Sequence, residues 1–142
     1  MLYFDTSYIV RLYVCDPGWE KVTALARTDA LACSILGRAE TIGAFHRKFR
    51  EGTFIRKDLL DALKQFEADC AAKAYEWLPL SHAVVDRLAK AYGALDASTH
   101  LRAADGIHLA SAAENGFREF YSNDAHLLAA SSNFGLSGRN VI

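Results

Sequence analysis

The chain has 142 residues, and 51% of them are hydrophobic, which suits a single globular domain with one substantial core. Its formal net charge of -1 excludes a generally basic nucleic-acid-binding protein, although it is compatible with a local basic patch beside an acidic site. The three cysteines lie far apart and form no Cys-x-x-Cys pair, so neither a disulfide framework nor a zinc site is indicated. Without an export signal or a long apolar span, we expect a cytoplasmic protein with no membrane partner.

The first predicted element is a strand over residues 1–5, because a short apolar run with aromatic side chains is typical of a buried strand. The strand ends on Asp5, which two hydroxyl residues follow. Helices are predicted over residues 6–14 and 19–28, separated by a Pro-Gly pair that stops a helix. Residues 30–34 then form a second buried strand of small side chains.

A helical hairpin is predicted next, from residue 35 to 50 and from about 56 to 73, because apolar residues recur at three- and four-residue spacing. The residues expected to face the core are, on the first helix, Ile35, Ala39, Ile42, Phe45 and Phe49 and, on the second, Leu59, Leu60, Leu63 and Phe66. Charged residues are expected to face outward.

The second half of the chain continues the alternation of strands and helices. The predicted elements are a strand at 75–80, a helix at 81–93, a helix from about 105 to 114, a strand at 118–122, a short helix from 123 to 128, and a short terminal strand at 140–142. This order predicts one α/β domain over residues 1–142, with a mainly parallel central sheet of four to five strands flanked by helices.

Four acidic residues are expected to meet at one edge of this sheet, because open α/β sheets bind ligands outside the carboxyl ends of their strands. Asp5 and Asp124 follow predicted strands, whereas Glu40 and Asp105 lie in predicted helices. Each aspartate could instead serve only as a helix cap or first-turn residue. Glu40 lies too far inside its helix to cap it, and its helix neighbours at three and four residues include the small Gly37, Gly43 and Ala44, which leave room for a metal or another segment.

Carboxylates gathered in one crevice repel one another unless a cation neutralises them. Ligands that are all oxygen favour Mg²⁺ or Mn²⁺ over zinc, with water and substrate phosphate in the remaining positions. Such an ion can activate water for attack on a phosphodiester. The acids therefore predict metal-dependent hydrolysis of nucleic acid.

Four segments carry these acids in a characteristic order. They are Tyr3-Phe4-Asp5-Thr6-Ser7, Ser34 with Glu40, Ala104-Asp105-Gly106-Ile107-His108-Leu109-Ala110-Ser111-Ala112, and Ser122-Asn123-Asp124 with Leu127-Leu128. Together they resemble the signature of PIN-domain ribonucleases, above all the VapC toxins of bacterial and archaeal toxin-antitoxin pairs. The segment that begins at Asp105 is the most specific of the four, although Gly106 stands where the family more often has alanine.

The resemblance implies a PIN-like domain that acts as an endoribonuclease dependent on Mg²⁺ or Mn²⁺. It implies that the catalytic and metal-binding residues are Asp5, Glu40, Asp105 and Asp124. Ser122 matches a hydroxyl position of the family, and Thr6 and Ser7 match residues beside the first acid, where a hydroxyl either orients a carboxylate or caps a helix. The implied partners are an RNA substrate, a VapB-type antitoxin and a second copy of the chain. We interpret His108 as a packing histidine that could hold a carboxylate, rather than as a metal ligand.

Basic residues offer two candidate contacts to an RNA backbone. Arg102 lies just before Asp105, and a separate basic segment with interleaved phenylalanines contains Arg47, Lys48 and Arg50. The basic segment is equally consistent with two amphipathic helix faces in water.

Two functions of other classes compete with the nuclease. A non-catalytic PIN-like module that binds RNA or protein would keep its acids only for capping and solubility, and this alternative stays open. A phosphoacceptor receiver domain would need an acidic pair after the first strand and a lysine near the last, and neither Asp5-Thr6 nor the segment around Asp124 supplies them.

Overall fold

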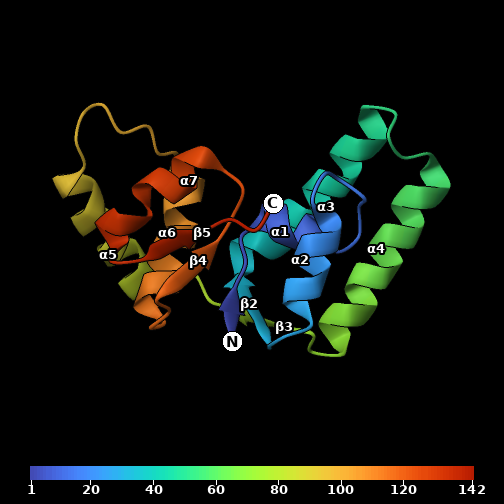
Figure 1. Cartoon of the computed structure of the whole chain (residues 1–142), viewed down its shortest axis with the longest axis horizontal. Coiled ribbons are helices and arrows are strands. Elements are labelled where there is room, and N and C mark those ends of the chain that lie inside the picture. Colours follow the sequence, from blue (N-terminus) through green and yellow to red (C-terminus); the bar gives the residue numbers. More distant parts are fainter.

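Five short parallel strands run through the middle of the computed structural model, which describes all 142 residues (Figure 1). Three of them form one sheet in the order β1-β2-β3, and the other two form a second sheet, β4-β5. The strands are β1 (Leu2–Tyr3), β2 (Leu31–Ser34), β3 (Tyr75–Leu78), β4 (Glu119–Tyr121) and β5 (Ser137–Arg139).

The two sheets meet at the end of β1. Phe4 forms a parallel bridge with Tyr121, and the Asp5 N–H donates to the Tyr121 carbonyl oxygen at 3.0 Å. The Phe4 N–H donates in the other direction, to the Ala32 carbonyl oxygen of β2 at 3.0 Å. The strands therefore follow the order β3-β2-β1-β4-β5, which confirms the predicted α/β fold with a mainly parallel sheet of four to five strands.

Helices cover both sides of the strands, with α1 to α4 on the right of Figure 1 and α5 to α7 on the left. They are α1 (Thr6–Val10), α2 (Trp19–Ala26), α3 (Ile35–Arg50), α4 (Arg56–Ala71), α5 (His82–Ala94), α6 (Ala103–Glu114), α7 (Ala125–Ala130) and a 3₁₀ helix η1 (Ser131–Phe134). None of these helices combines the length and the apolar character needed to cross a membrane.

The first strand supplies one aromatic side chain to each of two hydrophobic cores. Tyr3 stacks on Phe120 with ring centroids 5.3 Å apart, in the core beneath α5, α6 and α7. Phe4 packs edge-on against Tyr8 at 5.1 Å, in the core formed with α1 to α4. Successive side chains of a strand point to opposite faces, so β1 is covered on both faces and lies at the centre of the domain.

The predicted inner face of α3 is correct at Phe45 and wrong at three of its five residues. Ile35, Ala39 and Ile42 are exposed, whereas the helix faces the core through Gly37, Thr41 and Phe45. A Cβ atom on Gly37 would lie 2.3 Å from the Cys33 sulfur, so the helix approaches β2 too closely for a larger side chain. The close approach at this glycine, and not the apolar pattern, selects the buried face.

Three other expectations about elements differ from the structure. On α4, Leu60 is exposed, while Leu59, Ala62 and Phe66 are buried. The first helix ends at Val10 instead of residue 14, and the turn that follows contains Tyr13, whose hydroxyl donates to Asp69 at 2.6 Å. The last strand is β5 and not residues 140–142; it packs closely on η1, where a Cβ on Gly138 would lie 2.9 Å from Ser131 Oγ.

Gly106 differs from the alanine that the resemblance leads one to expect, and the packing of α5 on α6 explains why. A Cβ atom at this position would lie 2.6 Å from Leu88 Cδ1 and 3.0 Å from the Tyr92 ring. The glycine therefore sets how closely α5 approaches the helix that carries Asp105.

The buried face of α3 can be tested by comparing two alanine substitutions. Phe45 is fully buried, so Phe45→Ala is expected to lower the free energy of unfolding by about 3–5 kcal/mol. Ile42 is 39% exposed, so Ile42→Ala on the same helix is expected to cost about 1 kcal/mol or less. Urea denaturation measures both values, and equal losses would contradict the orientation of α3 described above.

Candidate metal centre

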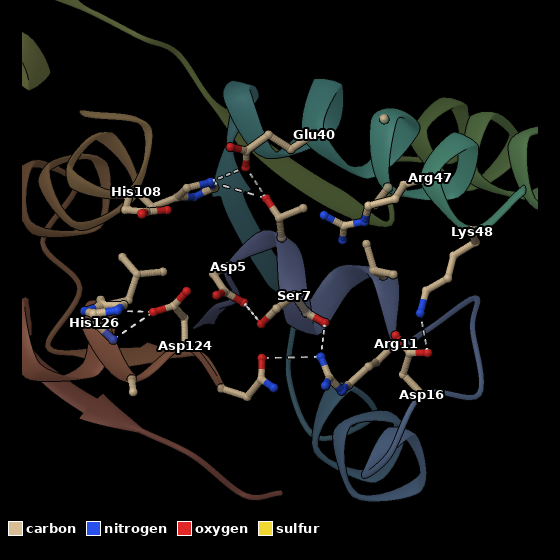
Figure 2. Close-up of a pocket in the computed structure, with 18 of the residues that line it drawn as sticks. Asp5, Ser7, Arg11, Asp16, Glu40, Arg47, Lys48, His108, Asp124 and His126 are labelled. Atoms are coloured by element: carbon tan, nitrogen blue, oxygen red, sulfur yellow. Dashed lines mark hydrogen bonds and ion pairs between the residues drawn. The ribbon is translucent and has the colours of Figure 1, made fainter. Parts of the chain in front are cut away.

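A pocket of about 820 Å³ opens where β1 and β4 end (Figure 2). The strand order reverses between these two strands, and such switch points are where open α/β sheets bind ligands. The lining includes all four acids named from the sequence, Asp5, Glu40, Asp105 and Asp124, together with Thr6, Ser7 and His108. The fold thus brings four carboxylates from distant parts of the chain to one pocket.

Asp5 is the most enclosed of the four acids, with 3% of its surface exposed. Ser7 Oγ donates to its Oδ1 at 2.6 Å and Ser122 Oγ donates to its Oδ2 at 2.5 Å. The Tyr8 N–H also donates to Oδ1 at 3.0 Å, so Asp5 caps α1. Burial raises the pKa of the Asp5 carboxyl, against the effect of these three hydrogen bonds.

Glu40 is held through one of its two carboxylate oxygens. Thr6 Oγ1 donates to Oε2 at 2.5 Å, and His108 Nε2 lies 2.8 Å from the same oxygen. Burial alone would raise the pKa of Glu40, but the hydrogen bond and charge of His108 and the Thr6 hydroxyl lower it. The charged carboxylate is therefore the favoured form at this position.

Asp105 and Asp124 lie near the starts of α6 and α7. The Arg102 side chain donates from Nε to Asp105 Oδ2 at 3.1 Å. Asp124 caps α7, because its Oδ1 accepts the N–H groups of His126 at 2.8 Å and Leu127 at 3.2 Å. Asp5 and Asp124 therefore each cap a helix, and both also line the pocket.

The supporting hydroxyls all contact the acids. Ser122 Oγ accepts the Asp124 N–H at 2.9 Å while it donates to Asp5, so it connects the ends of β1 and β4. Thr6 and Ser7 each donate to a carboxylate, and the cap of α1 is Asp5 itself. Thr6 and Ser7 could either orient a carboxylate or cap a helix, and their contacts are those of residues that orient carboxylates.

Three of the acids keep one oxygen without a hydrogen-bond partner in the protein: Glu40 Oε1, Asp105 Oδ1 and Asp124 Oδ2. No three His, Cys, Asp or Glu side chains, however, lie close enough together to hold a single ion. Mg²⁺ is commonly bound by only one or two carboxylates, with water and substrate phosphate completing its shell. The donors are all oxygens, which is the ligand type that Mg²⁺ and Mn²⁺ prefer, and they do not form a closed site made by protein ligands alone.

Basic side chains form part of the same pocket. Arg47, Lys48 and Arg50 line it, and Lys48 forms an ion pair with Asp16 at 2.6 Å. Arg102 is 81% exposed, bonds to Asp105 and is not among the lining residues. The structure thus joins the basic segment of α3 to the acidic pocket and leaves Arg102 at its edge.

Sequence reasoning assigned no site role to four polar residues of the pocket, namely Arg11, Asp16, Asn123 and His126. Arg11 is fixed by the carbonyl oxygens of Ser7 at 2.8 Å and Pro17 at 3.0 Å. The signal for Arg11 was its spacing, because it follows Ser7 by four residues at the end of the same helix and so shares its face. Figure 2 shows Arg11 and Ser7 together beside Asp5.

Fold and site together define an α/β domain with a carboxylate-lined pocket at the switch point of a parallel sheet. The model of the PIN domain family matches residues 2–132, so the chain belongs to this family, whose members are generally nucleases. The resemblance stated from the sequence is thereby confirmed. No curated protein matches the chain significantly.

Two solved structures have the same fold. The chain is similar to the structure of FitAcB from Neisseria gonorrhoeae, with a TM-score of 0.75 and 17% identity over 99% of this chain and 97% of that chain. It is also similar to VapBC2 from Rickettsia felis bound to a DNA fragment from their promoter, with a TM-score of 0.69 and 15% identity over 99% and 98% of the two chains. At these identities the similarity establishes the fold.

The burial of Asp5 predicts a stability effect that depends on pH. A carboxyl whose pKa is raised by folding destabilises the folded state when ionised, and this cost disappears below its unfolded pKa, ordinarily 3.8. Asp5→Asn is therefore expected to raise the free energy of unfolding at pH 7, with an advantage that shrinks as the pH falls toward 3.8. Urea denaturation at several pH values measures the difference.

The exposed Asp86 of α5 provides the control, because Asp86→Asn is expected to leave the stability at pH 7 almost unchanged. A less stable Asp5→Asn variant at pH 7 would contradict the prediction. It would show that the hydrogen bonds from Ser7 and Ser122 outweigh the cost of burying the charge.

Proposed function

We propose that this protein is an endoribonuclease that depends on Mg²⁺ or Mn²⁺ and acts as the toxin of a type II toxin-antitoxin pair. The observation that carries the proposal is the pocket itself, where four carboxylates from separate segments meet at the switch point of the sheet. Membership of a family of nucleases supports the reaction class.

In this proposal the metal ligands come from Asp5, Glu40, Asp105 and Asp124, with one or two of them bound directly to an ion and water completing its shell. A bound Mg²⁺ or Mn²⁺ ion would supply Lewis acidity, which lowers the pKa of water and offsets negative charge on a phosphodiester. Thr6, Ser7 and Ser122 hold three carboxylate oxygens in place by donating hydrogen bonds. A carboxylate oxygen not engaged by the ion can orient the attacking water and accept its proton.

The proposed RNA substrate would be held by the basic wall of the pocket. Arg47 and Arg50 line this wall, and Arg11 lies near the acids in a fixed orientation. Phosphate groups attract such side chains regardless of sequence, so these residues would supply affinity more than sequence preference. Lys48 contributes less in this arrangement because Asp16 already pairs with its ammonium group.

Cleavage assays test the proposed reaction directly. RNA is expected to be cleaved with Mg²⁺ or Mn²⁺, and activity is expected to be lost with EDTA. Asp5→Asn and Glu40→Gln are each expected to lower the rate by more than about 100-fold, since each removes a charged ligand. Asp86→Asn, an exposed acid outside the pocket, is the matched control and should cleave at the normal rate.

Cleavage that is indifferent to EDTA and to Asp5→Asn would exclude the proposed mechanism. The alternative, a non-catalytic PIN-like module, is favoured by one observation, the absence of any three acids close enough for a single ion. It would be established if calorimetry detected no Mn²⁺ binding at millimolar concentrations while RNA or a protein partner still bound.

The basic wall predicts a dependence on salt. Arg47→Ala and Arg50→Ala are each expected to weaken RNA binding for all sequences alike, and to reduce the slope of log affinity against log salt by about one. Lys64→Ala, an exposed residue of α4 outside the pocket, is the matched control and should keep the normal slope. Binding by fluorescence anisotropy at several salt concentrations measures the slopes, and unchanged slopes for both arginine variants would contradict the assignment.

The proposed partners are a VapB-type antitoxin and a second copy of the chain. The similar structure of VapBC2 supports this kind of partner, because its name denotes a VapB–VapC pair bound to promoter DNA. A small neighbouring gene that encodes a DNA-binding segment, and whose product binds this protein when both are produced together, would support the pairing. A solitary gene would indicate a PIN nuclease that acts alone.

A further inference from the structure

His108 is a fully buried histidine with no role in the proposed reaction as described above. Its side chain is 2% exposed, and it lies on α6, one turn after Asp105. Its imidazole extends across the pocket to Glu40 of α3, as Figure 2 shows. The contact therefore joins two helices that come from opposite sides of the sheet.

Contacts on both ring nitrogens fix the orientation of this imidazole. Nε2 lies 2.8 Å from Glu40 Oε2 and must be the donor there, because a carboxylate can only accept. Nδ1 lies 3.2 Å from the hydroxyl of Tyr3, a fully buried residue of β1. The Ser34 N–H donates to the same hydroxyl at 3.1 Å, so the Tyr3 side chain is itself anchored to β2.

The two contacts to Glu40 fall on the same oxygen. Thr6 and His108 both reach Oε2, and Oε1 has no partner in the protein. A carboxylate held through one oxygen can present the other to a cation without losing its support. Residues that hold metal ligands in this way typically contribute 10- to 100-fold to metal affinity.

We infer that His108 is a positioning residue, which holds Glu40 through Oε2 so that Oε1 stays available to the metal ion. The inference rests on the proposed function, since it assigns to Glu40 the role of a ligand. The successive contacts from β2 through Tyr3 and His108 to Glu40 fix the position of this ligand relative to the sheet, although the glutamate side chain itself is flexible.

The test measures Mn²⁺ affinity by calorimetry on the whole protein without RNA. His108→Leu keeps an apolar side chain in the buried space but removes the donor, and it is expected to weaken Mn²⁺ binding by roughly 10- to 100-fold. His108→Gln can place an amide donor near the position of Nε2, and it is expected to recover part of the lost affinity. Urea denaturation of each variant shows whether it is folded.

A double-mutant comparison separates positioning from a general structural role. If His108 acts through Glu40, His108→Leu should weaken Mn²⁺ binding strongly in the normal protein but hardly at all in a Glu40→Gln background. Equal losses in both backgrounds would overturn the inference. If His108→Leu does not fold, the pair His108→Gln and His108→Asn replaces it, because the shorter asparagine cannot reach Glu40; equal Mn²⁺ affinities of that pair would likewise overturn the inference.

The outcome for the unsubstituted protein separates this inference from the proposed function. If the protein binds Mn²⁺ and cleaves RNA while folded His108→Leu binds Mn²⁺ equally well, only the role of His108 is wrong. If the unsubstituted protein binds no Mn²⁺, the proposed function fails and the role of His108 fails with it.

Discussion

The pairing of the end of β1 with both of its neighbours is the constraint on which the rest of the structure depends. The N–H of Phe4 is bonded toward β2, and the N–H of the next residue, Asp5, is bonded toward β4. This change of partner within two residues joins the two sheets and creates the switch point. Asp5 leaves the sheet at that point, so its carboxylate lies where helices from both sides can bring other acids near it.

The negative charges of the acids in the pocket are compensated by different groups. Asp5 accepts hydrogen bonds only from neutral groups, and burial raises its pKa although these hydrogen bonds and the charge of His108 lower it. Burial raises the pKa of Glu40 as well, but His108 and Thr6 reverse the effect, and Arg102 neutralises part of the charge at Asp105. If a cation binds as proposed, it would offset the cost of burying the Asp5 charge.

The same residues serve the fold and the pocket. Asp5 and Asp124 cap the helices that follow β1 and β4, and Ser122 connects their two segments through a pair of hydrogen bonds. His108 belongs to a helix that packs against both β2 and α5, and it reaches Glu40 across the sheet. Structural and site-forming roles are thus not alternatives in this protein, because the caps and the buried histidine are what place the carboxylates.

The sequence by itself determined the order and kind of most elements, the mainly parallel sheet and the four acids as candidates, because strand length, helix periodicity and turn residues are local signals. Tertiary structure alone decided which stripe of α3 is buried, since the close approach at Gly37 depends on Cys33 of a neighbouring strand. It also decided that His126 lines the pocket and that His108 contacts Glu40, from which it is separated by 68 positions in the chain. Such contacts depend on how helices pack across a sheet, and no local pattern in the chain encodes that packing.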